Sequence, residues 1–119
     1  MGMVEVEMTI ANPLQAERQA IVTLLVDTGA TYSMIPRRVL EQIGIEALEL
    51  GEFETADGSR IQRDIGEVSF HWNGKRRTST VIFGEETDSA LLGLVALESL
   101  ALEVDPFNRQ LRPAKLILY

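Results

Sequence analysis

Seven glycines divide most of this sequence into short segments, at positions 44, 51, 58, 66, 74, 84 and 93. The segments between them are rich in valine, isoleucine, threonine and aromatic residues, which favour strands. Turn signals at intervals of about 8–12 residues are typical of sandwiches and barrels. The sequence therefore predicts an all-β protein. Its 119 residues suit a single domain over 1–119 with one hydrophobic core.

Hydrophobic patterning locates several strands and turns. Residues 4–10 alternate apolar side chains with glutamate and threonine, which indicates a half-buried strand. Residues 20–26 form an apolar run, which predicts a strand buried on both faces. Residues 111–119 are predicted to end the chain as a strand. The dipeptides Asp57-Gly58 and Asn73-Gly74 separate strand-like segments and predict hairpin turns.

Two short helices are expected beside the strands. Residues 36–43 begin with a proline, which is favourable at the first helical position, and are followed by Gly44, a common C-terminal stop. Residues 94–100 are also predicted to be helical. The fold class is therefore all-β with one or two short helices.

A carboxylate stands where the apolar run ends, in the tripeptide Asp27-Thr28-Gly29. A carboxylate on a turn after a buried strand is well placed for acid–base chemistry. The hydroxyls of Thr28 and Ser33 lie close enough in sequence to hold it. A tripeptide alone is a weak signal, and the alternative is an aspartate that caps its own turn. Its context therefore decides between the two.

The order of features after Asp27 supplies that context. A hairpin tip follows at residues 56–59 (Ala56, Asp57, Gly58 and Ser59), then Leu91-Leu92-Gly93, and then the predicted helix. This order resembles one lobe of the retropepsin-like aspartic proteases, and looks most like their small single-lobe bacterial and archaeal members. The resemblance runs from about residue 20 to 118. It implies a retropepsin-like lobe built as a closed or partly open β-barrel.

The resemblance also implies roles for individual residues. Asp27 would be the catalytic carboxylate, and Thr28 would hydrogen-bond across a dimer. Gly29 would let the backbone approach the carboxylate and the substrate. The remaining supports of the active-site loop would be Ala30, Ser33 and Gly93. The hairpin from Ala56 to Arg60, with Asp57, Gly58 and Ser59, would be a flap that closes over a bound peptide or protein substrate.

The chain carries the Asp-Thr-Gly motif once. Peptide hydrolysis by carboxyl groups alone needs two of them sharing one proton. The sequence therefore predicts a homodimer in which two copies of Asp27 meet, and two-fold dimers are the commonest assemblies. No cofactor or metal is expected. The alternative is a dimeric peptide-binding module of the same fold that is catalytically weak or inactive.

Two positions depart from the retroviral pattern. Those enzymes usually carry aspartate where Thr31 stands and arginine where Leu94 stands, and the two form an ion pair that supports the dimer. Because both are missing here, the dimer must be stabilised otherwise. The outer terminal strands and burial of the apolar residues 116–118 are the candidates.

Charge and composition exclude several other functions. The net charge of −7 argues against nucleic-acid binding, which needs a basic face. No apolar run approaches the ~20 residues of a membrane span. The chain has no cysteine, and its N-terminus has no signal-peptide pattern, so a cytoplasmic protein without membrane attachment is expected.

Other polar residues are interpreted without a catalytic role. His71 is expected to lie on the surface, facing away from Phe70 and Trp72, and as the only histidine it weakens any Ser-His-Asp proposal. The acidic residues 85–88 are expected to form a solvated loop, and not a metal site. The basic residues 75–77 are expected to protect an edge strand from aggregation.

Overall fold

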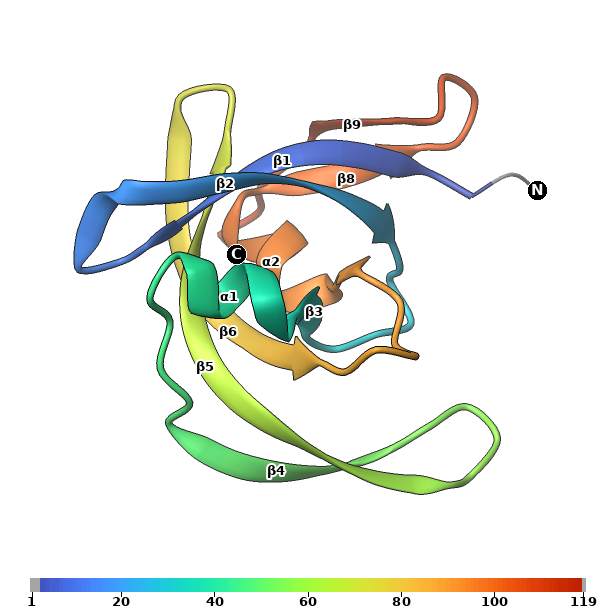
Figure 1. Ribbon diagram of the computed structural model, residues 1–119. Coiled ribbons are helices and arrows are strands. Elements are labelled where there is room, and N and C mark those ends of the chain that lie inside the picture. Colours follow the sequence, from blue (N-terminus) through green and yellow to red (C-terminus); the bar gives the residue numbers. More distant parts are fainter. Residues whose placement is uncertain (1–2, 119) are drawn as a thin grey trace.

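The computed structural model describes residues 3–118. Within this range the chain forms nine strands and two short helices (Figure 1), so the predicted all-β class is confirmed. In chain order they are β1 (Glu5–Asn12), β2 (Gln15–Val26), β3 (Ser33–Pro36), α1 (Arg37–Gln42), β4 (Glu49–Glu54), β5 (Arg60–Trp72), β6 (Lys75–Gly84), β7 (Leu91–Leu92), α2 (Leu94–Ser99), β8 (Leu102–Asp105) and β9 (Gln110–Pro113).

Six strands close into a barrel. The main sheet has the order β1-β2-β7-β3-β6-β5-β4, and β1 also pairs with β5, which joins the two sides of the sheet. β4 stays outside this ring, because it pairs with β5 alone. β8 and β9 form a separate antiparallel hairpin. The predicted closed or partly open barrel is therefore confirmed.

The hydrophobic core lies inside the ring, where helix α2 packs against β3, β6 and β8 (Figure 1). Burying each large apolar side chain contributes about 1.5–3 kcal/mol relative to leaving it exposed. The largest fully buried side chains come from both halves of the chain and include Met8, Ile10, Leu24, Ile35, Leu40, Phe70, Phe83, Leu92 and Leu100.

The turns and helices agree with their predictions. Gly58 has φ 87°, and Asn73 and Gly74 have φ 47° and 82°, the positive values that tight hairpin turns require. α1 begins one residue later than predicted, after Pro36, and is followed by Gly44 with φ 80°. α2 ends one residue earlier than predicted.

β2 differs from its prediction in length and in burial. It begins at Gln15, because its hairpin with β1 continues almost to the turn at residues 13–14. Val22 and Leu24 are buried, but Ile21 is 72% exposed. The prediction that both faces are buried was therefore wrong. β2 lies in the barrel wall, where only one face meets the core.

The C-terminal strand is shorter than predicted. β9 ends at Pro113, and the N–H of Ala114 then donates to the carbonyl of Ala101 at 2.8 Å. The apolar residues 116–118 follow outside any strand, with exposed fractions of 73%, 76% and 91%. Residue 119, the last of the predicted strand, lies outside the described residues.

Candidate active site

Asp27 stands on a tight turn directly after β2. Its N–H donates to the carbonyl of Leu92 at 2.9 Å, and its carbonyl accepts from the N–H of Ala30 at 3.1 Å. The carboxylate bends back over the turn, where Oδ1 accepts from the N–H of Gly29 at 2.9 Å. The side chain is only partly buried, so the carboxylate remains accessible although the backbone holds one of its oxygens.

Ser33 and Gly93 support this turn from the interior. Ser33 is fully buried, and its Oγ accepts from the N–H of Gly93 at 3.0 Å. A Cβ at Gly93 would lie 2.5 Å from the carbonyl carbon of Tyr32. Only glycine therefore lets the two segments approach this closely. Ser33 and Gly93 therefore contact each other and the segment after the Asp27 turn, and their role as supports of an active site stays a prediction.

The start of α2 holds the rest of the loop. The N–H of Leu94 donates to the carbonyl of Ala30 at 2.8 Å, and the N–H of Val95 donates to that of Thr31 at 3.0 Å. These two amides belong to the first turn of the helix, where no partner exists within the helix itself. The loop is therefore fixed along its length by β7 and α2. Thr28 is exposed.

The predicted flap is a hairpin whose tip is closed by hydrogen bonds. The N–H of Thr55 donates to the carbonyl of Ser59 at 2.8 Å, and the Asp57 carboxylate accepts from the Thr55 hydroxyl and from the N–H of Ser59. The Thr55 hydroxyl, followed by the Ser59 contacts, lowers the pKa of Asp57 to about 2. All of residues 56–60 are exposed.

The flap tip and the Asp27 turn remain separate within one chain. In Figure 1 the β4–β5 hairpin extends to the same side of the molecule as the loops that contain residues 27–32 and 85–90. Among the described residues, no hydrogen bond joins residues 56–59 to residues 27–33. The structure thus brings Asp27, Gly29, Ala30, Ser33 and Gly93 together but does not include the flap tip in that group.

The acidic loop at 85–88 is exposed at residues 85–87, as its sequence predicted, but Asp88 is partly buried. Asp88 pairs with Arg63, and its side chain is only 14% exposed. Glu85 pairs with Arg37 at 2.9 Å. Sequence reasoning missed both pairs, because their partners lie 25 and 48 residues apart and no local spacing marks them.

His71 also differs from its prediction. It is partly buried, and its Nε2 is enclosed without a hydrogen-bond partner. Burial, and then the nearby Arg76, lower its pKa. It lines a surface hollow of about 710 Å³ together with Trp72 and residues 75–77, and none of residues 27–33 lines that hollow.

Comparison with known proteins identifies both the family and the fold. The family model described as gag-polyprotein putative aspartyl protease matches residues 13–99, more than half of the chain. No curated protein matches the sequence. Among residues 3–118, neither helix is long and apolar enough to cross a membrane.

Several solved structures have a similar fold. The EIAV protease, in complex with the inhibitor HBY-793, has a TM-score of 0.64 and 15% identity, covering 98% of this chain and 94% of that one. The simian foamy virus (mac) protease has a TM-score of 0.52 and 20% identity, with 82% and 92% covered. A retropepsin-like aspartic protease from Rickettsia conorii has a TM-score of 0.50 and 19% identity, with 88% and 89% covered. The predicted retropepsin-like fold is confirmed.

Proposed function

Because this chain belongs to the gag-polyprotein putative aspartyl protease family, we propose that it is an aspartic endopeptidase that works as a homodimer. The observation that carries the proposal is the Asp27 turn. It presents a partly exposed carboxylate on a loop that β7 and α2 hold by backbone hydrogen bonds. A loop that is fixed in this way keeps the carboxylate in one orientation, which acid–base catalysis requires.

A second chain completes the chemistry. Two carboxyl groups about 3 Å apart cannot both ionise cheaply, so such a pair holds one shared proton. The ionised member takes a proton from water, and the protonated member polarises the carbonyl of the peptide bond. Each chain supplies one Asp-Thr-Gly motif. A two-fold axis beside Asp27 brings the second carboxyl group from an identical chain.

The exposed groups around the site support this assembly. Thr28 is exposed, so its hydroxyl is available to bond the loop of a second chain. The apolar residues 116–118 are largely exposed in the single chain and gain burial from a second copy. Two exposed positions, Thr31 and Leu94, replace the ionic pair of retroviral enzymes, so apolar contact carries more of the dimer's stability.

The substrate is an extended peptide segment between the Asp27 turns and the two flap hairpins. Main-chain hydrogen bonds to both sides fix such a segment whatever its side chains are. Closure of Ala56, Asp57, Gly58 and Ser59 over the peptide excludes water other than the reacting molecule.

The test compares the wild type with Asp27→Asn on unfolded protein substrates, from about pH 3 to pH 7, where a carboxyl dyad changes protonation. The substitution keeps the shape of the side chain and removes its charge. We expect cleavage by the wild type, none by the variant, and the same dimeric mass for both in light scattering. Equal cleavage by the two proteins, or cleavage by neither, would contradict the proposal.

The same experiment separates the peptidase from a pure binding module. A binding module would retain a fluorescent peptide equally well in both proteins and release it uncut. A monomeric mass at every protein concentration would exclude both forms of the dimeric site.

A further inference from the structure

The flap hairpin, defined here as residues 49–64, is attached to the barrel by one strand. β4 pairs with β5 alone, and β5 gains its next neighbour, β6, only from Ile65 onward, opposite Ile82. The hairpin projects beyond the barrel (Figure 1), and residues 63–65 of β5, where it leaves the barrel, are here called the hinge. Contacts made at this hinge are therefore placed to affect the direction in which the hairpin points.

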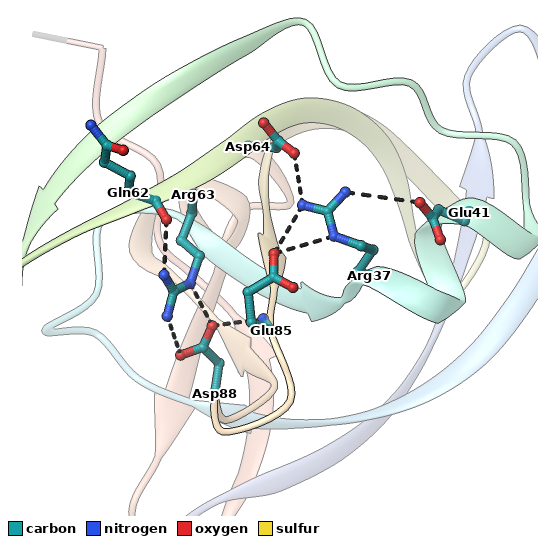
Figure 2. A network of polar contacts seen from close by, with 7 residues as sticks. All are labelled: Arg37, Glu41, Gln62, Arg63, Asp64, Glu85 and Asp88. Atoms are coloured by element: carbon teal, nitrogen blue, oxygen red, sulfur yellow. Dashed lines mark hydrogen bonds and ion pairs between the residues drawn. The ribbon is translucent and has the colours of Figure 1, made fainter.

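Two consecutive residues of β5 form ion pairs at this hinge (Figure 2). Arg63 donates from Nε and Nη2 to the two carboxylate oxygens of Asp88, at 2.7 and 3.0 Å. Asp64 accepts from the Arg37 guanidinium at 2.7 Å, and the same guanidinium donates to Glu85 at 2.9 and 3.2 Å. Successive side chains of a strand project to opposite faces, so the strand is held from both sides.

The Arg63–Asp88 pair is the better enclosed of the two. Its side chains are 16% and 14% exposed, whereas those of Arg37, Asp64 and Glu85 are 31–46% exposed. The bidentate contact fixes the guanidinium plane as well as its distance. A third donor of Arg63, Nη1, bonds the carbonyl of Gln62 at 2.8 Å. The Arg63 side chain is thus locked to its own strand and to the 85–88 loop together.

That loop leads directly to the floor of the site. Asp88 Oδ2 also accepts from the N–H of Glu85 at 2.7 Å, which closes the loop into a turn. Two residues after Asp88, the carbonyl of Ala90 accepts from the N–H of Leu25 at 3.0 Å. The carbonyl of Leu92 accepts from the N–H of Asp27 at 2.9 Å. A short path of hydrogen bonds and chain therefore runs from the flap hinge through Asp88 to the backbone of Asp27.

We propose that Arg63 and Asp88 are positioning residues that hold the flap hairpin at a set height above the Asp27 turn. This inference rests on the proposed peptidase function, and it adds which residues set the position of the flap over that site. The Arg63 contact outweighs burial and lowers the pKa of Asp88, so the pair stays charged under mildly acidic conditions.

Spin labels measure the flap position without any need for activity. The chain has no cysteine, so Ala56→Cys at the flap tip and Glu98→Cys on α2 accept labels at two defined sites. Pulsed electron paramagnetic resonance, with labelled chains diluted in unlabelled ones, then gives the distribution of distances between the two labels. We expect a narrow distribution in this parent and a broader one when Asp88→Asn or Arg63→Gln is added.

The control is Glu103→Gln, which breaks the Arg112–Glu103 pair of 2.8 Å on the β8–β9 hairpin. It should leave the distribution unchanged. In unlabelled protein, Asp88→Asn should lower kcat/KM about tenfold, mainly through KM, because the flap loses its position while Asp27 keeps its own. If Asp88→Asn does not fold, Arg63→Lys, which keeps the charge and loses the bidentate contact, should still broaden the distribution.

An unchanged distribution in the folded Arg63 and Asp88 variants would overturn the proposal, whatever their activity. Equal broadening by Glu103→Gln would overturn it too, since the effect would then be general loosening. A wild type that cleaves nothing would contradict the peptidase function alone, because the label distances test the hinge independently.

Discussion

Ser33 and Gly93 lie 60 residues apart in the chain and are joined by a buried hydrogen bond of 3.0 Å. The bond ties the strand that follows the Asp27 loop to the residue that precedes α2. Since the first amides of α2 hold the carbonyls of Ala30 and Thr31, this one contact sets how the helix meets the loop. The orientation of the candidate catalytic carboxylate therefore depends on two residues that carry no charge.

Ser33→Ala should destabilise the protein by about 1–3 kcal/mol, because it leaves the buried N–H of Gly93 without a partner. Urea unfolding at neutral pH measures the change. Ser89→Ala, at an exposed position on the loop before β7, is the control and should stay within about 0.5 kcal/mol of the wild type. A loss for Ser33→Ala no larger than that of the control would show that the bond contributes little.

Gly93→Ala should cost about 1–3 kcal/mol or more, because the new Cβ would lie 2.5 Å from backbone atoms that cannot rotate away. Gly58→Ala is the contrasting variant. A Cβ there meets nothing within 4 Å, and only the positive φ of 87° opposes it, for a cost of about 1–2 kcal/mol. The melting temperature of Gly93→Ala should be lower than that of Gly58→Ala. The reverse order would contradict the close approach of the Tyr32 backbone to Gly93.

Elements that are specified by a few neighbouring residues were predictable from sequence. Asp57-Gly58 and Asn73-Gly74 specify their turns through positive φ, and the signals at Pro36 and Gly44 define α1 to within one residue at each end. The two turns and α1 each depend on a few neighbouring residues. Asp27 was singled out because it follows an apolar strand and because the hairpin, Leu91-Leu92-Gly93 and helix come after it in the retropepsin-like order.

Features that depend on distant partners were not predictable in the same way. Gly66 was taken as turn punctuation, but it lies inside β5, where a Cβ would meet the Phe83 ring and the carbonyl of Glu46 at 3.0 Å. The exposure of Ile21 depends on which face of the barrel wall its strand presents. The Arg63–Asp88 pair exists only because β5 passes over the 85–88 loop, which single-sequence periodicity does not encode.

The flap tip should keep its order well into the acidic range. The folded pKa of Asp57 is about 2, below its usual value of 3.8. The stabilisation of the turn by the ionised carboxylate is therefore complete above pH 3.8 and is lost as the pH falls through about 2. In an NMR titration, the Ser59 amide should follow the Asp57 carboxyl with a midpoint near 2. Asp57→Asn should abolish that titration. A midpoint near 3.8 in the wild type would mean that the carboxylate does not cap the turn.

His71 should make the fold less stable in mild acid. Burial lowers its folded pKa below 6.5, so the unfolded chain binds the proton more readily. Stability is therefore lost as the pH falls through 6.5 toward the folded pKa. The loss of unfolding free energy between pH 7 and pH 5 should be smaller for His71→Phe than for the wild type. An identical loss in the two proteins would show that this histidine is not desolvated in solution.

Charges placed on the C-terminal apolar segment should separate the dimer and leave each chain folded. Leu116 and Leu118 are 73% and 91% exposed, so a single chain gains almost nothing from them, whereas a dimer would bury them. Leu116→Asp with Leu118→Asp should therefore give a monomer in light scattering, with a circular dichroism spectrum and melting temperature close to those of the dilute wild type. Cleavage should fall with the dimer, because a separated chain no longer has the Asp27 of a second chain beside its own. Phe107→Asp is the matched control: Phe107 is 95% exposed on the β8–β9 turn, and its loss should alter neither mass nor activity. A double variant that stays dimeric and active would place the interface elsewhere on the barrel.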